Sequence, residues 1–445
     1  MAPPTFDRRF SVTRSRSSVP SVHAAGRPER PARRDAPPGP WRIARLLDAP
    51  HRLGFFVGSA MVSTSALWWL ATLATQLVAH RQIRWAVAPA HAHALLMSFS
   101  FMPMFFAGFL FTAGPRWLAL PALPGRSLLP VAAAWLAGWG IYLAGVHLDP
   151  RLAAAGLATV AAGWTLFVWR LAQLLRRSRV ADRTHLRVIG CACGIGAAAL
   201  WAAAAGLAAD AAALVGAALA VGLWWFLSPV FATAMHRMVP FFGVAAPRLD
   251  ERHPEWLLWT LLVVLGLQVP LASGVLANPL LAALTFIVDG AAAALVLGLA
   301  LRWRATQNLR IRLLAMLDLG FVWLGLALVL QAASAAQAWW AGEAHQPSIA
   351  SLHALGMGFF GSIQFAFVTR VSAGQDGRAQ AIDGIAWALF LVLQAAVAVR
   401  IAAAWLPSTP TLLLAAAALW MIAMLAWAAR HARWYGRPRS DGRPG

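Results

Sequence analysis

Twelve long apolar segments constrain the fold of this chain more than any other feature of its sequence. Each is close to the ~20 residues that an α-helix needs to cross the hydrocarbon core of a bilayer. Because backbone polar groups cannot stay unpaired in lipid, such segments predict membrane-spanning helices. The segments run over residues 53–79, 88–113, 127–147, 152–175, 187–208, 211–236, 256–276, 279–301, 313–340, 348–369, 383–405 and 408–429.

The composition excludes a soluble protein of this length. Of the 445 residues, 60% are hydrophobic and 12% are charged, and the mean hydropathy is +0.64. A soluble domain needs about a quarter of its residues charged to cover its surface. Cys191 and Cys193 lie inside one apolar segment, and we interpret them as small packing residues. The fold class is therefore all-α, a polytopic membrane protein with about twelve transmembrane helices.

The charge distribution predicts how the chain is oriented. The formal net charge is +21, and all 37 basic residues are arginines, which fall between the apolar segments. With twelve spans, 33 arginines lie on one side, and only Arg81, Arg84, Arg151 and Arg400 lie on the other. Positive charge marks the cytoplasmic side, so both termini should be cytoplasmic in a bacterial inner membrane. The expected partner is the lipid bilayer, and this pattern does not indicate nucleic acid.

Three regions follow from this organisation. Residues 1–50 are rich in Pro, Arg and Ser without an apolar period, which predicts a disordered cytoplasmic tail. Residues 51–430 form the predicted transmembrane domain, and residues 431–445 form a short basic cytoplasmic tail.

Histidines at the predicted periplasmic helix ends are the strongest candidates for chemistry. His91 and His93 open the second segment, and His353 lies about one turn into the tenth, at a similar predicted depth. Two neutral imidazoles facing each other across a bundle can clamp a haem iron or a copper ion. The alternative is that they are interfacial histidines, hydrogen-bonded to loops and headgroup water.

The spacing of the pair limits how both histidines can act. In a regular helix, residues two apart point about 200° apart, so His91 and His93 cannot face one centre. Either each serves a different centre, or the helix begins after His91.

Several other polar or irregular positions lie inside the apolar segments. Pro103 and Pro229 should kink the second and sixth segments. Asp289 and Asp318 should pair with arginines at helix ends in preference to relaying protons. Arg116 and Arg370 end the second and tenth segments, where each either holds a haem propionate or marks the interface.

Small residues after His353 should share one helical face. Ala354, Gly358 and Gly361 permit the close approach of either another helix or a flat porphyrin. The formal G-x-G-x-x-G formed by residues 356–361 lies inside an apolar segment, and this excludes a dinucleotide-binding turn.

Four blocks of the sequence resemble those of the NnrS family, in order and over nearly the whole membrane region. They are PHRLGFF (50–56), HAHALLMSFSFMPMFFAGFLFTAGPRWL (91–118), HRMVPFF (236–242) and HALGMGFFGSIQFAFVTRVSAGQDGR (353–378). The resemblance implies a twelve-helix inner-membrane protein that carries haem b and copper and takes part in nitric oxide metabolism or nitrosative-stress resistance.

The resemblance also implies site residues. His91, His93 and His353 match the metal-ligand positions, and the remaining matches are Arg237, Pro240, Thr369, Arg370, Gly374, Gly377 and Arg378. Two positions depart from the family pattern, because many members have an acidic residue at Ala94 and a histidine at Gln375. His51 and His236 are then the histidines able to replace the ligand missing on the cytoplasmic side.

Three functional hypotheses follow. In the first, haem iron binds nitric oxide while copper tunes it or accepts electrons, and an unidentified separate partner donates electrons. In the second, the protein is a transporter or a metal or haem delivery protein that uses the same ligands transiently. A relative of the haem-copper oxidases is the third, but the chain has no adjacent His-His pair and only two tyrosines, Tyr142 and Tyr435. No catalytic residue is assigned.

Overall fold

The computed structural model describes residues 39–242, 255–272, 279–306, 309–343, 347–378, 382–406 and 408–441. All regular elements within these ranges are helices, as predicted. Most of the segment predicted to be disordered, together with His23, His253 and His345, lies outside the described residues. In chain order the helices are η1 (Ile43–Leu47), α1 (Pro50–Leu77), α2 (Pro89–Phe99), α3 (Met102–Trp117), η2 (Gly125–Leu128), α4 (Leu129–Leu148), α5 (Pro150–Arg177), α6 (Thr184–Ala208), α7 (Ala212–Val221), η3 (Gly222–Leu227), α8 (Ser228–Phe242), α9 (Glu255–Ala272), α10 (Pro279–Thr306), α11 (Arg312–Ala341), α12 (Ile349–His353), η4 (Ala354–Phe360), α13 (Gly361–Gln375), α14 (Gly384–Trp405) and α15 (Pro410–Tyr435).

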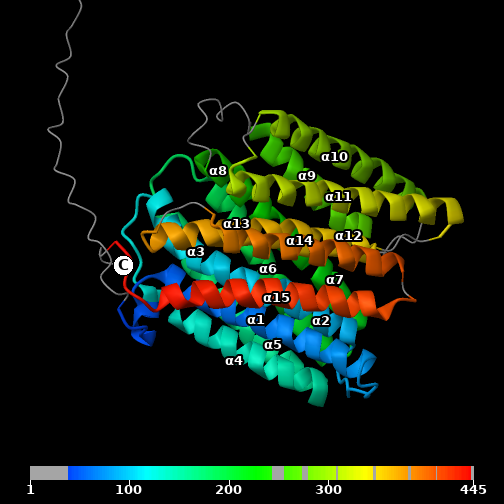
Figure 1. Ribbon diagram of the computed structural model, residues 1–445, viewed down its shortest axis with the longest axis horizontal. Helices are drawn as coiled ribbons and strands as arrows, with labels where there is room; N and C mark the ends of the chain where they lie inside the picture. The colour runs from blue at the N-terminus through cyan, green and yellow to red at the C-terminus, as the bar shows by residue number, and fades with distance from the viewer. Residues whose placement is uncertain are drawn as a thin grey trace, which may run out of the picture. The chain divides into compact units, whose positions relative to one another are not determined.

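These helices form a multi-pass membrane bundle. Eleven helical spans among the described residues are long and apolar enough to cross a bilayer, and α9 is a shorter apolar helix. Together they match the twelve predicted segments in order. Four spans are built from consecutive pieces, namely α2 with α3, η2 with α4, α7 with η3 and α8, and α12 with η4 and α13. The last helix, α15, packs along α1, so the first and last spans are neighbours (Figure 1).

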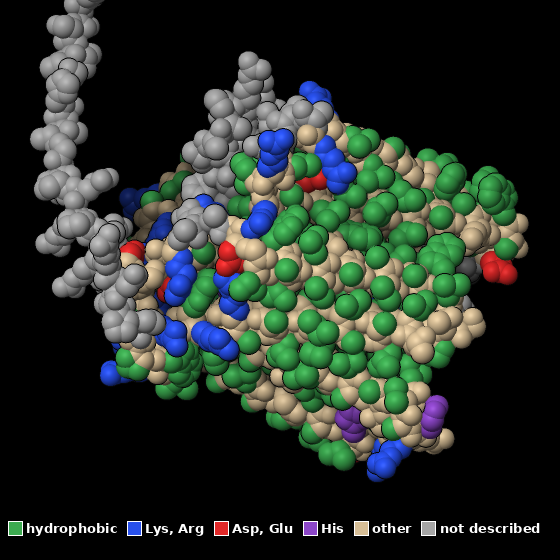
Figure 2. All heavy atoms as spheres, viewed as in Figure 1, with side chains coloured by type: hydrophobic (Ala, Val, Ile, Leu, Met, Phe, Trp, Pro, Cys, Tyr) green, Lys and Arg blue, Asp and Glu red, His purple; other side chains and the backbone are tan. Residues whose placement is uncertain are grey.

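The arginines divide the bundle into two ends. Figure 2 shows arginine side chains gathered toward one end of the visible face, beside a wide apolar surface. We call the end reached by the C-terminus of α15 the arginine-rich end, and the end where α2 and α12 begin the arginine-poor end. The cytoplasmic location of the arginine-rich end stays a prediction.

The second span breaks where the sequence predicts. Helix α2 ends at Phe99, and α3 begins at Met102 with Pro103 in its first turn. The break is stabilised by hydrogen bonds from neighbouring helices. Trp135 Nε1 donates to the Ser100 carbonyl at 2.6 Å, and the Ser65 and Ser100 hydroxyls lie 2.8 Å apart. Backbone groups released by a kink are thus paired again inside the bundle.

Two spans contain π-helical turns. Pro229 lies in the first turn of α8, directly after the π-helical η3, so the predicted irregularity is at this position. The second π-helix, η4, directly follows His353 and was not predicted. Such π-helical turns occur often at functional sites, because they change the direction of side chains within a helix.

The two intramembrane acids differ in their partners. Arg304 Nε donates to Asp318 at 2.8 Å, which confirms the predicted pairing with an arginine near a helix end. The same prediction was wrong for Asp289, since Gln268 of α9 donates to its carboxylate. The physical reason is that Asp289 lies mid-helix and fully buried, where a neighbouring amide is nearer than any helix-end arginine.

Candidate functional site

Two histidines from different spans meet at the arginine-poor end. His93 lies one turn into α2, which starts at Pro89, and His353 ends α12, which starts after its Ser348 N-cap. Their ring centroids are 6.2 Å apart, and the ring planes differ by 17°. The α1 residue Trp69 covers His93, with ring centroids 4.0 Å apart. The two predicted ligands of the second and tenth segments therefore share one place in the fold.

The free ring nitrogens suit metal ligation. His353 Nδ1 lies 2.8 Å from the Ile349 carbonyl, an interaction that fixes the ring and leaves Nε2 free. Metal-bound histidines commonly use their second nitrogen in this way. His93 Nδ1 is buried and has no hydrogen-bond partner among the described residues. A buried polar atom without a partner is costly, unless a ligand satisfies it.

The distance between the rings also fits a shared metal ion. A metal–nitrogen bond of about 2 Å and about 1 Å more to each ring centre place two opposed imidazoles about 6 Å apart. The observed 6.2 Å matches this requirement.

A cavity surrounds the histidine pair. The volume that the centre of a water-sized molecule can reach is about 170 Å³, and the total empty space, part of which is open to solvent, is about 920 Å³. Cofactor pockets usually measure about 300–1,000 Å³. This space has room for a metal ion with a small ligand, and a planar macrocycle would also use the part that is open to solvent. Most of the lining is apolar, as in a site that excludes water.

Three methionines line the same cavity, namely Met97, Met102 and Met357. Met97 follows His93 by four residues, and Met357 follows His353 by four, and both line the cavity. Side chains four apart lie on nearly the same side of a helix. Among the described residues, no cluster of three or more His, Cys, Asp or Glu side chains can hold an ion. Any ion at this site therefore depends on the two imidazoles, the thioethers or an added cofactor.

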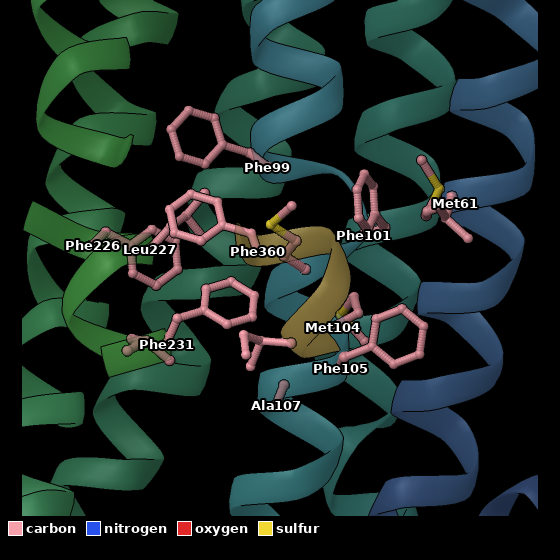
Figure 3. Close-up of a cluster of buried hydrophobic side chains, with 14 of the residues drawn as sticks. Met61, Phe99, Phe101, Met104, Phe105, Ala107, Phe226, Leu227, Phe231 and Phe360 are labelled. Carbon is pink, nitrogen blue, oxygen red and sulfur yellow. The ribbon is translucent and has the colours of Figure 1, made fainter. Parts of the chain in front are cut away.

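Figure 3 shows a cluster of buried aromatic and aliphatic side chains, three of which line the cavity. These three are Phe101, Leu227 and Phe360. Phe360 stacks on Phe231 at 4.7 Å, and Phe231 lines a second cavity of about 60 Å³. The cluster thus separates the histidine pair from the apolar interior nearer the arginine-rich end.

A sequence-family profile described as NnrS protein matches residues 45–439. The chain belongs to the NnrS family. No curated protein and no solved structure matches it.

In this NnrS-family chain, His91 does not join the histidine pair. Helix α2 has already begun at Pro89, so His91 and His93 point to different sides of one helix. His93 and Ala94 line the cavity, but His91 does not. Of the two alternatives left by the spacing, the later helix start is excluded.

The histidines near the arginine-rich end lie in two separate places. His236 Nδ1 lies 3.1 Å from His185 Nε2, a pairing that the sequence did not reveal. His51 is buried, and its Nδ1 has no hydrogen-bond partner among the described residues. Gln375 shares a cavity of about 10 Å³ with His51, room for about one water molecule. His51, and not His236, therefore lies beside the position where many NnrS members have a histidine.

The two predicted propionate partners are far from the histidine pair. Arg370 follows His353 by 17 residues in one nearly continuous span, which corresponds to roughly 25 Å. Arg116 ends α3 at the same arginine-rich end and is exposed. Neither lines the cavity. The arginine that does line it is Arg400 of α14, which the sequence analysis assigned only to the topology.

The glycines after His353 face different surroundings. A Cβ on Gly358 would lie 2.7 Å from Trp323 of α11, so the small residue there permits helix packing. A Cβ on Gly356 would meet nothing within 4 Å, and Gly356 lines the cavity. On the face predicted for Ala354, Gly358 and Gly361, Gly358 therefore meets a helix, whereas the open space lies at Gly356, outside that face.

The end of the fourth NnrS-like block, residues 353–378, has a structural role in this fold. Thr369 Oγ1 accepts a hydrogen bond from Trp427 Nε1 at 2.9 Å. Gly377 has a φ of +74°, a left-handed conformation that favours glycine. Arg378 pairs with Asp376 at 2.5 Å and lies over the ring of Trp434. These contacts join α13 to α15.

Proposed function

We propose that this protein is a haem- and copper-binding inner-membrane protein that acts on nitric oxide or on the damage it causes, and that His93 and His353 hold the haem. The supporting observation is the parallel pair of imidazoles 6.2 Å apart beside a mostly apolar cavity. Family membership supports the same proposal, since the resemblance implies haem and copper. Bound haem would supply a redox-active iron.

The residues of the chain have distinct tasks in this proposal. The Ile349 carbonyl orients His353 and raises the basicity of its free nitrogen. Trp69 holds the His93 ring in place from one side. The apolar lining excludes water, which protects a bound ligand from competing reactions. Phe360 and Leu227 close the inner side of the cavity.

The test is an optical spectrum of the full-length protein, purified in detergent from haem-replete cells, together with its iron and copper contents. We expect a Soret band, and His93→Ala and His353→Ala should each alter it. His91→Ala is the matched control, because His91 lies two residues from His93 and does not line the cavity. A wild-type protein without a Soret band, or unchanged spectra in both alanine variants, would refute the proposal.

A second candidate function is delivery of copper(I) across or within the membrane. It is favoured by Met97 and Met357, because soft thioether ligands select copper(I). If this function is correct, the purified protein contains copper without haem, and Met97→Leu together with Met357→Leu lowers its copper content. Met104→Leu serves as control, since Met104 is buried on α3 away from the cavity.

A further inference from the structure

Arg400 is a charged residue in an otherwise uncharged cavity. It lies on α14 and lines the same space as His93 and His353, in which no Asp or Glu side chain takes part. The side chain is half-buried, and its positive charge lies in the cavity that both imidazoles line. An arginine in such surroundings is rare, because burying its charge without a counter-charge is costly.

No counter-charge for Arg400 is present in the described part of the protein. No hydrogen bond or ion pair is formed by its guanidinium with any described residue, whereas Arg304, Arg378 and Arg430 each pair with an aspartate. The other three arginines predicted for this end, Arg81, Arg84 and Arg151, are exposed. Arg400 alone among these four directs its charge toward a cavity.

We infer that Arg400 forms an anion-binding subsite next to the histidine pair. A guanidinium offers five N–H donors in a planar fork that matches a carboxylate or a small oxyanion such as nitrite. Two sources of this chemistry are compatible with the site, namely a carboxylate carried by a macrocycle on His93 and His353, and a free anion. The first source rests on the proposed haem function, and the second does not.

The open mouth of the cavity supports the first source. A macrocycle held by both histidines would reach the part of the cavity that is open to solvent, where the empty space totals about 920 Å³. Arg400 is only half-buried, so its guanidinium can meet a carboxylate at the edge of such a macrocycle. In this arrangement Arg400 is a positioning residue, and Arg116 and Arg370 have no contact with the cofactor.

The test compares Arg400→Gln, Arg400→Lys and wild type, with Arg151→Gln as the control for an exposed arginine at the same end. Two quantities are measured on full-length protein in detergent. One is the rate of haem transfer to apomyoglobin, and the other is the affinity of the haem-free protein for nitrite by calorimetry. If the anion is a carboxylate of the macrocycle, Arg400→Gln should lose haem about tenfold to a hundredfold faster, with a smaller effect in Arg400→Lys.

If the anion is free, haem loss should match wild type, and the nitrite affinity should fall about tenfold or more in Arg400→Gln alone. An Arg400→Gln protein that equals wild type and Arg151→Gln in both measurements would overturn the subsite. Arg400 would then extend only to headgroup water. A wild-type protein without haem would refute the proposed function instead, and the nitrite measurement would still decide the role of Arg400.

Discussion

Replacing Gly358 by alanine tests the packing around the histidine pair. The new Cβ would lie 2.7 Å from Trp323 Cγ, about 0.8 Å closer than two carbon atoms prefer. Trp323 cannot move freely, because its Nε1 donates to Gln394 at 2.7 Å and Gln394 donates to Ser362 at 3.0 Å. The added methyl group therefore strains the α11 contact, the hydrogen bonds or both.

The magnitude follows from these contacts. Overpacking costs about 1–3 kcal/mol, and a weakened hydrogen bond adds about 1 kcal/mol. Replacing a glycine within a helix by alanine stabilises the folded state by about 0.5–1 kcal/mol. Gly356→Ala gains only this last contribution, because its Cβ would meet no atom within 4 Å. The two variants should therefore differ by about 2–4 kcal/mol, although they lie two residues apart.

The assay is the apparent Tm of the detergent-solubilised protein at one fixed heating rate, because large membrane proteins often unfold irreversibly. We expect Gly358→Ala to melt several degrees below wild type, and Gly356→Ala to melt at or above it. Trp323→Leu combined with Gly358→Ala should show a favourable coupling, since it removes the clash. Equal Tm values for the two alanine variants would refute the packing argument.

Two further predictions concern buried polar groups. Trp135→Phe removes the donor to the Ser100 carbonyl at the α2–α3 break and should cost about 1–3 kcal/mol by the same melting assay. Trp139→Phe is its control, because the Trp139 indole is equally buried and has no hydrogen-bond partner among the described residues, and equal losses would contradict the prediction. Burial raises the pKa of Asp376 above its ordinary value, so the folded state holds this proton more tightly than the unfolded state. The contribution of Asp376 to stability is therefore full below pH about 4 and is lost as the pH rises through the raised pKa. The Tm of wild type relative to Asp376→Asn should fall as the pH rises above about 4, and a difference independent of pH would exclude this role.

The sequence predicted the fold well because its signals are local. Length and apolar continuity identify spans, since each helix in lipid has to satisfy its own backbone. Pro103 predicted the α2–α3 break for an equally local reason, because proline lacks an N–H and restricts the residue before it. The common depth of His93 and His353 also followed from counting residues along two spans.

The contacts within the site could be predicted less well from the sequence. Asp318 lies near the end of its span and met the expected arginine, whereas Asp289 lies mid-span and met Gln268 from another helix. The His185–His236 pair joins residues 51 positions apart, and no periodicity in the sequence indicates it. A search for histidines at matching depth on the arginine-rich side is the one signal that could have suggested this pair.

The helix ends that carry histidines, the order of the spans and the α2–α3 break were thus determined by the sequence alone. Tertiary structure alone decided that His93 joins His353 and His91 does not, and that Arg400 reaches the cavity while Arg116 and Arg370 do not. The reason is physical. Hydropathy fixes where a helix crosses the bilayer, but lipid gives no hydrophobic preference for one neighbour over another. Which helices meet is settled by close contacts such as Gly358 against Trp323, and these join residues far apart in the chain.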